Sequence, residues 1–251
     1  MKIDLTGKVA LVTGGARDIG RATVLALADA GATVVVNYLA SGDKAETVVK
    51  EVRSRGGTAV AVQADVTRPD EVEHLVTEAR RLGDRVHIVV NNAGGLVARK
   101  RVDEMTPEFW DTVLTLNLKS VFLVTRAVLP SIPEGGAIVN LASLAARDGG
   151  GPGALAYATA KGAVLTFTRG LSKELAARKI RVNCVSPGLI NTTFHDTFTK
   201  PEVRQAIAGR TSVGREGEAA DVANVITFLA SDASSYINGE SIEINGGLYF
   251  V

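Results

Sequence analysis

Short runs of β-branched and other apolar residues alternate along this chain with longer segments that have helical spacing. The expected strands are Val9–Thr13, Thr33–Asn37, Thr58–Val62, Val86–Asn91, Ala137–Leu141, Arg181–Val185 and Ser241–Ile244. The expected helices are Arg21–Ala30, Asp43–Arg55, Pro69–Leu82, Pro107–Val128, Ala154–Arg178 and Ala219–Ala230. Several of the strands are apolar on both faces, as in parallel sheets that are covered on both sides. The pattern predicts an α/β fold with a doubly wound, seven-stranded parallel sheet and helices on both faces.

The length of the chain favours one domain. A chain of 251 residues matches a single large α/β domain, residues 1–251, better than two complete domains. The longest break in the alternation is the irregular stretch at about 189–217. Long loops in compact domains often serve as lids, so this stretch is the expected substrate lid.

Charge and composition narrow the possible partners. The chain has 28 Lys and Arg against 27 Asp and Glu, so no basic excess argues for nucleic acid or an anionic membrane. No apolar run approaches the roughly 20 residues that span a bilayer, and the first apolar run, Val9–Val12, is too short for a signal peptide. The single cysteine, Cys184, suits a reducing compartment. We therefore expect a soluble cytoplasmic protein.

The first expected strand runs into a glycine-rich turn, Thr13–Gly20 (TGGARDIG), and then into a helix. A glycine turn at this junction of a Rossmann-type sheet lets the backbone and the helix N-terminus approach a pyrophosphate. Gly14, Arg17, Asp18 and Ile19 are therefore candidate cofactor residues. Asp18 stands where a TGxxxGxG pattern has glycine. Asp tolerates positive φ and is a good N-cap, and Arg17 or Arg21 would offset its charge beside the pyrophosphate.

The end of the second expected strand bears on the choice of cofactor. An acidic residue there would accept a hydrogen bond from the ribose 2′-hydroxyl of NAD and repel a 2′-phosphate. This chain has Asn37 and Tyr38 at that point, and Arg17 in the glycine turn is a candidate phosphate partner. NADP(H) is favoured, and NAD(H) remains possible if Arg17 is only a solvated loop residue.

The candidate catalytic residues are Tyr157 and Lys161, in a segment of helical spacing, and Ser143, just after the fifth strand. Residues four apart share a helix face, so the lysine ammonium lies beside the phenol. An ammonium and a positive nicotinamide both favour phenolate, which brings a side chain with a pKa near 10 closer to neutral pH. Strand ends are where this architecture places its site.

Together these motifs resemble the short-chain dehydrogenase/reductase family, single-domain branch, over essentially the whole chain. The resemblance implies that Asn117 kinks its helix and holds a water in a proton relay with Ser143, Tyr157 and Lys161. It also implies cofactor contacts from Asp65, Val66, Asn92, Ala93, Gly94, Tyr157, Lys161, Pro187, Gly188, Ile190 and Thr192. The chain is about equally similar to 3-oxoacyl-carrier-protein reductases and to sugar dehydrogenases. By resemblance we also expect a homotetramer.

The activity implied is hydride transfer between NADP(H) and a small carbonyl compound or secondary alcohol, with Tyr157 as acid or base. Arg147, Arg99 and His195 are candidate substrate contacts, which would suit a keto acid or sugar acid; solvated surface side chains are the alternative interpretation. The alternatives are a 3-oxoacyl-thioester reductase and a non-catalytic NADP(H)-binding sensor. No metal is expected, because His74 and His87 lack metal-ligand spacing.

Overall fold

The computed structural model describes residues 3–251 and confirms the doubly wound sheet. All pairings among its strands are parallel, in the order β3-β2-β1-β4-β5-β6-β7. The strands are β1 (Val9–Val12), β2 (Thr33–Tyr38), β3 (Thr58–Gln63), β4 (Ile88–Asn91), β5 (Ala137–Leu141), β6 (Arg181–Pro187) and β7 (Ser241–Ile244). The order reverses between β1 and β4, and a crevice outside the carboxyl ends at such a reversal is where these folds bind ligands.

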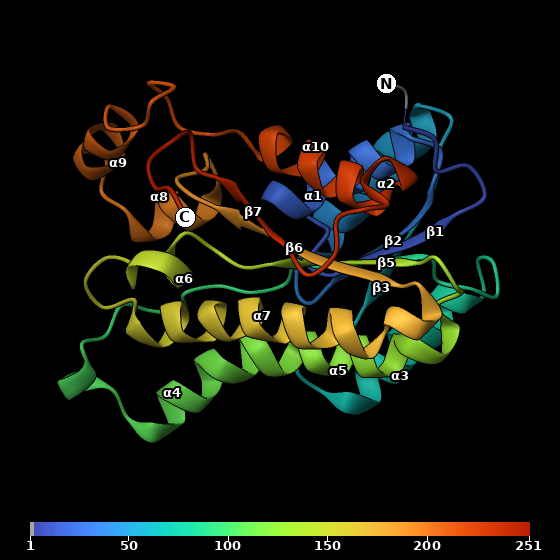
Figure 1. Cartoon of the computed structure of the whole chain (residues 1–251), viewed down its shortest axis with the longest axis horizontal. Helices are drawn as coiled ribbons and strands as arrows, with labels where there is room; N and C mark the ends of the chain where they lie inside the picture. Colours follow the sequence, from blue (N-terminus) through green and yellow to red (C-terminus); the bar gives the residue numbers. More distant parts are fainter. Residues whose placement is uncertain (1–2) are drawn as a thin grey trace.

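Helices cover both faces of the sheet (Figure 1). One layer contains α1 (Asp18–Asp29), α2 (Gly42–Ser54) and α10 (Ala219–Ala230). The other contains α3 (Pro69–Arg80), α4 (Pro107–Leu114), α5 (Ser120–Val128) and α7 (Leu155–Glu174). Two apolar clusters fill the spaces between sheet and helices; Val24 and Ile226 belong to one, Leu75 and Val124 to the other. The strands read as apolar because both of their faces are buried.

The predicted helix Pro107–Val128 is continuous but not regular. α4 passes through a π-helical turn, Thr115–Lys119, before it becomes α5. A π turn contains one extra residue, so it shifts every later side chain around the helix axis. By length and composition the segment Pro107–Ser131 could cross a membrane, but here it is a partly buried helix that packs against α3 and α7.

The stretch at 189–217 contains two helices that were not predicted. They are α8 (Thr193–Phe198) and α9 (Pro201–Ala208), and the short α6 (Ala145–Asp148) follows β5. Figure 1 shows α6, α8 and α9 together at one end of the sheet. Arg204 of α9 holds this region together through Asp196, Glu216 and the Asn191 side chain. The predicted lid is therefore an ordered helical element rather than an irregular loop.

Candidate functional site

Tyr157 and Lys161 lie one turn apart near the start of α7, as the spacing predicts. Lys161 is almost fully buried, and its Nζ donates to the carbonyl oxygen of Leu141 at 2.7 Å, at the end of β5. The same Nζ lies 5.7 Å from the centre of the Tyr157 ring. The end of β5 thus fixes the lysine beside the phenol.

Burial controls the protonation of both side chains. It lowers the pKa of Lys161 to about 8, because the ammonium is desolvated. Burial also raises the pKa of Tyr157, and a hydrogen bond with Ser143 opposes that rise. We expected the lysine ammonium and a positive nicotinamide together to lower the tyrosine pKa; the protein groups by themselves raise it, because the phenolate is desolvated. The phenol is therefore held protonated, which is the form that can give a proton to a carbonyl oxygen.

Ser143 lies two residues beyond the end of β5, and its hydroxyl faces the Tyr157 phenol. The Ser143 oxygen accepts from the Ala145 backbone N–H at 3.2 Å. The backbone N–H of Leu144, which lies between Ser143 and Ala145, donates to the carbonyl oxygen of Pro187 at the end of β6 at 2.9 Å. The serine is thereby fixed relative to both neighbouring strand ends.

Asn117 occupies the middle of the π-helical turn and is fully buried. Its side chain exchanges two hydrogen bonds with the Gly95 backbone, at 2.9 and 2.8 Å, and also donates to Val113 at 2.9 Å. A Cβ added to Gly94 would lie 2.7 Å from Asn117 Oδ1 and 3.2 Å from Lys161 Nζ. The structure thus places Asn117 and Lys161 next to Gly94, with Tyr157 beside Lys161 and Ser143 beside Tyr157.

The turn between β1 and α1 has the shape that a diphosphate requires. Gly14 has φ of +63°, and a Cβ on Gly20 would lie 2.2 Å from the Gly14 carbonyl oxygen, so neither position accepts an ordinary side chain without strain or a clash. Asn92 buttresses the turn by donating to the carbonyls of Thr13 and Gly14. The start of α1 therefore offers its backbone N–H groups to a ligand.

Asn37 supports this turn rather than facing outward from the end of β2. It is buried, its Oδ1 accepts from Gly14 N at 3.2 Å, and its Nδ2 donates to Ala64 O at 3.0 Å. Asp65 likewise turns inward and accepts from Thr67 N and Oγ1. Val66 is buried beside it. These residues shape the edge of the cofactor crevice.

Asp18 adopts the left-handed conformation expected at the glycine position, with φ of +52°. Its carboxylate does not cap α1, which corrects the prediction that it would. The carboxylate instead accepts from the Thr193 backbone and hydroxyl at the start of α8. Arg17 donates to the same hydroxyl at 2.7 Å, and Arg21 pairs with Glu51. Of the two arginines, Arg17 lies near Asp18, at 3.8 Å.

The segment after β6 forms the other wall of the crevice. Gly188 N donates to Ile244 O in β7 at 2.9 Å, and Ile190 is buried. The Thr192 hydroxyl donates to Ile190 O at 3.0 Å. The predicted nicotinamide residues Pro187, Gly188, Ile190 and Thr192 thus lie on one short segment that leads from β6 into the lid.

The side chains predicted to contact substrate are engaged with the protein. Arg147 is mostly buried and donates twice to Glu243 Oε1 in β7, at 3.1 and 2.9 Å. Arg99 donates to the carbonyls of Phe198 and Pro152, so it joins the lid to the loop after α6. His195 contacts Thr199 through Nδ1, and burial lowers its pKa. Arg147 is therefore paired with a carboxylate of the protein, whereas Arg99 is exposed, is bound only to neutral carbonyls and has no ion-pair partner among the described residues.

Phe194 is a site residue that the sequence did not reveal. Its ring lies 5.8 Å from the Tyr157 ring and 5.3 Å from Phe198, so the lid places an aromatic wall beside the phenol. Apolar residues in the lid sequence could have indicated a wall of the substrate site. Which of them faces Tyr157 depends on α8, which was not predicted.

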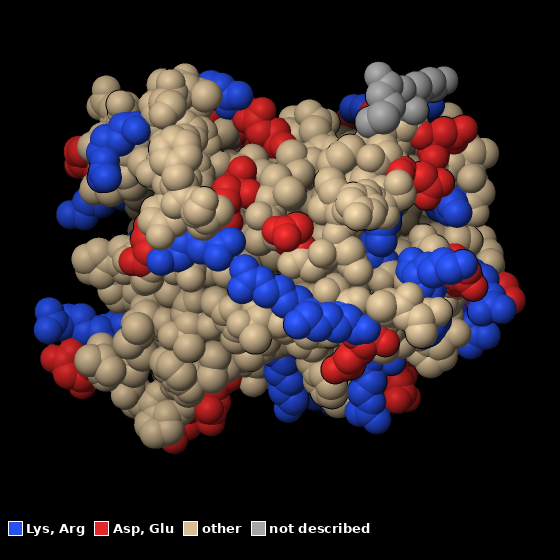
Figure 2. Space-filling view, viewed as in Figure 1, with Lys and Arg blue, Asp and Glu red and all other residues tan. Residues whose placement is uncertain are grey.

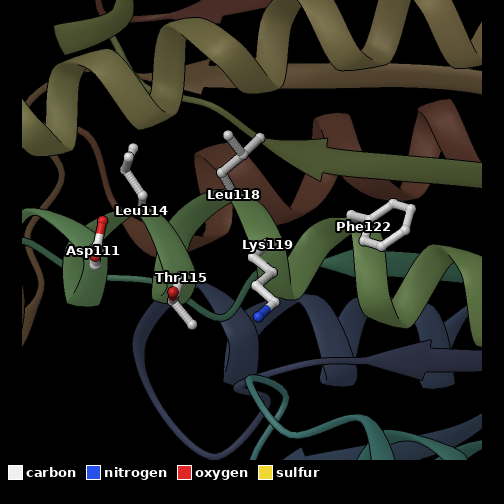
Figure 3. Close-up of a pocket in the computed structure, with 6 residues that line it drawn as sticks. All are labelled: Asp111, Leu114, Thr115, Leu118, Lys119 and Phe122. Atoms are coloured by element: carbon white, nitrogen blue, oxygen red, sulfur yellow. The ribbon is translucent and has the colours of Figure 1, made fainter.

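A separate groove lies on the α4–α5 helix and is shown in Figure 3. Its lining residues are Asp111, Leu114, Thr115, Leu118, Lys119 and Phe122. None of these belongs to the predicted site. Leu114, Leu118 and Phe122 give the groove an apolar character, and Phe122 is 45% exposed.

Comparison with known proteins places the chain among reductases. The family model described as "Enoyl-(Acyl carrier protein) reductase" matches residues 14–249. A 3-oxoacyl-[acyl-carrier-protein] reductase of Synechocystis sp. is 42% identical over 247 residues, which cover 97% of this chain and 98% of the relative.

Two solved structures extend the similarity to the whole fold. A short-chain dehydrogenase/reductase from Serratia marcescens has a TM-score of 0.92 and 34% identity, and the match covers 97% of this chain and 98% of that one. A blue fluorescent protein from a metagenomic library, solved in complex with NADPH, also has a TM-score of 0.92 and 34% identity, over 98% of this chain and 100% of that one.

Proposed function

Because this chain belongs to the short-chain dehydrogenase/reductase family and is an NAD(P)-dependent oxidoreductase, we propose that it reduces the ketone of a 3-oxoacyl thioester with NADPH. The observation that carries this proposal is the grouping of Tyr157 with Ser143 and Lys161, with Lys161 and Asn117 both next to Gly94. The Synechocystis relative supports the thioester class. A 3-oxo thioester is neutral at its reacting end, so it needs no free cation beside Tyr157.

The residues divide the reaction among themselves. The nicotinamide, when bound, supplies the hydride, and the glycine turn fits its diphosphate because of the close approach of Gly14 and Gly20. Ser143 donates a hydrogen bond to the substrate carbonyl oxygen and stabilises the charge that develops there. Tyr157, held protonated by burial, gives its phenolic proton to the same oxygen. Lys161, with Asn117 and Gly94 beside it, orients the cofactor ribose and favours the resulting phenolate.

A keto acid or sugar acid is the other substrate class that the sequence suggests. It would need a cation for its carboxylate. The pairing of Arg147 with Glu243 favours a neutral ketone, and Arg99, which is bound only to two backbone carbonyls, is the cation that an acid would have to use.

The test is to offer the enzyme a panel of 3-oxoacyl thioesters, keto acids and sugar acids. The rate of NADPH oxidation with each substrate is measured as the loss of NADPH absorbance. Tyr157→Phe is expected to lower kcat by a factor of about 10²–10⁴, the contribution of general acid catalysis. Tyr236→Phe, at an exposed tyrosine outside the site, is the matched control, and its turnover should stay near wild type. Turnover of the acids alone would overturn the thioester assignment. NADPH binding with no turnover of any carbonyl would instead favour the non-catalytic sensor.

The preference for NADP(H) is part of the proposal. It is supported by the absence of an acidic side chain at Asn37, Tyr38 and the following three residues, and by the NADPH complex of the blue fluorescent protein. Arg17 donates to Thr193 in this structure, so its role in binding the 2′-phosphate must be separated from its role in holding the lid. If Arg17 binds the 2′-phosphate, Arg17→Ala should raise KM for NADPH by roughly tenfold and leave that for NADH unchanged. Equal effects on the two cofactors would mean that Arg17 acts only on the lid.

Assembly into a homotetramer in the cytoplasm completes the proposal. Apolar side chains remain exposed at Phe122 on α5, at Leu155 on α7 and at Phe250 and Val251 in the C-terminal tail. Exposed apolar patches of this kind mark protein–protein contacts.

A further inference from the structure

Asp18 occupies a backbone position that favours glycine. Its φ of +52° lies in the left-handed region, where Asp is tolerated better than most residues but less well than glycine. Asp84, between α3 and β4, has a similar φ of +58° and lies far along the chain from the lid. The two residues allow the effect of the backbone conformation to be separated from the effect of the side-chain contacts.

The Asp18 carboxylate reaches a residue that is 175 positions away. Oδ1 accepts from the Thr193 backbone N–H at 3.1 Å, and Oδ2 accepts from the Thr193 hydroxyl at 2.5 Å. Arg17 donates to that hydroxyl at 2.7 Å, so the oxygen of Thr193 both donates and accepts. These are charge-assisted hydrogen bonds, the stronger kind, and the Asp18 side chain is only 24% exposed.

Thr193 is the first residue of the lid helix α8. Within the described chain, the preceding N-cap residue Thr192 makes no side-chain capping bond, because its hydroxyl donates to Ile190 O. A helix begins with N–H groups that lack partners inside the helix. Asp18 therefore supplies from the glycine turn the acceptor that a local cap residue would provide.

The next residue of α8, Phe194, contacts the catalytic phenol. Its ring lies 5.8 Å from that of Tyr157. An unbroken series of contacts thus leads from the glycine turn through Asp18 and Thr193 to the wall beside Tyr157. Figure 1 shows that α8 and the start of α1 lie toward the same end of the sheet.

We propose that Asp18 is a positioning residue that fastens the start of α8 to the glycine turn and thereby holds Phe194 against the substrate beside Tyr157. The inference concerns the lid, and only its kinetic test rests on the proposed function. Asp18 acts on Phe194, which lies beside Tyr157, and not on the Tyr157 proton donor. Loss of the Asp18 carboxylate therefore affects binding of the carbonyl substrate more than the chemical step.

Amide hydrogen exchange tests the contact without any substrate. In Asp18→Gly, which fits the positive φ, exchange of the Thr193 amide and of α8 should accelerate by roughly tenfold, as for the loss of a charge-assisted hydrogen bond. Asp84→Gly is the matched control and should leave α8 unchanged. Thr193→Val keeps the backbone donor but loses the hydroxyl, so a smaller acceleration is expected. Equal exchange in wild type and Asp18→Gly would overturn the proposal.

Steady-state kinetics tests the consequence for the reaction. Asp18→Gly should raise KM for the carbonyl by on the order of tenfold while kcat stays within about twofold, and Asp18→Asn, which keeps one acceptor oxygen, should lie between. A fall in kcat at constant KM would overturn the positioning role. If Asp18→Gly does not fold, Asp18→Asn and Thr193→Val decide by the same two measurements. If wild type reduces no carbonyl, the proposed function fails, and the exchange experiment still decides the role of Asp18.

Discussion

At the scale of single residues, the proposed reaction depends on two buried side chains whose pKa values move in opposite directions. Burial holds Tyr157 as a phenol and makes the Lys161 ammonium easier to deprotonate, with a pKa of about 8. A rise in pH therefore removes the lysine charge before it removes the tyrosine proton. The folded pKa of Lys161 lies below its ordinary value, so its burial lowers stability most at neutral pH, and this penalty shrinks as pH rises above about 8.

We predict that kcat/KM for carbonyl reduction falls as pH rises through about 8, because the uncharged Lys161 no longer orients the ribose or favours the phenolate. A pH profile of kcat/KM, from neutral to well above this value, measures the effect. Lys161→Met should lose activity at every pH. Lys173→Met, an exposed lysine on the same helix, should keep the wild-type profile. A profile that stays flat well beyond pH 8 would contradict the assignment to Lys161.

At the scale of elements, the π-helical turn in the α4–α5 helix places an amide where a regular helix would place a different side chain. Asn117 satisfies three hydrogen bonds with Gly95 and Val113, and so fixes the loop that contains Gly94. Lys161 lies across the same glycine. The turn therefore links the shape of one helix to the position of a catalytic side chain on another.

Asn117→Ala should lower both stability and activity. Three lost hydrogen bonds at about 0.5–1.5 kcal/mol each give a loss of roughly 2–4 kcal/mol in the free energy of unfolding. Chemical denaturation measures that loss, and kcat should fall with it because the Gly94–Gly95 loop no longer fixes the surroundings of Lys161. Ser120→Ala, which removes a hydroxyl bonded to Leu116 O within the same helix, is the control with near wild-type kcat. An unchanged kcat in Asn117→Ala would show that the relay does not use this amide.

Sequence reasoning succeeded where local pattern and burial agree. The strands are buried on both faces, so their apolar runs predicted a parallel sheet, and Tyr157 and Lys161 followed from helical spacing. The kink that the resemblance implied at Asn117 is present as a π turn, which the apolar pattern alone did not indicate because one inserted residue barely alters it. α8 and α9 were missed because they are short, and the start of α8 is held by Asp18, which is 175 positions away along the chain. The pairing of Arg147 with Glu243 could not be predicted either, because the two residues are 96 positions apart along the chain.

At the scale of the whole molecule, the distribution of charge does not single out a surface for the proposed assembly. Basic and acidic side chains are interspersed on the face shown in Figure 2, in agreement with the nearly equal counts of the two kinds. Apolar groups on the α4–α5 helix are the better candidates for contact between subunits. Leu114, Leu118 and Phe122 lie together in the groove of Figure 3, on an outer helix of the fold.

Phe122→Glu should therefore weaken assembly. Assembly would bury the new carboxylate in an apolar contact without a partner. Burying this charge costs several kcal/mol and shifts the population toward smaller oligomers. Sedimentation velocity on wild type and variant measures this shift directly. Tyr236→Glu is the matched control, because Tyr236 is a fully exposed aromatic residue outside this groove, and it should sediment as wild type does. A wild-type monomer, or an assembly that Phe122→Glu leaves intact, would show that this helix face serves another purpose.

Asn117 belongs to the same continuous helix as Phe122, so loss of assembly should also lower the stability of the π turn. An accompanying fall in kcat would connect the assembly to the site.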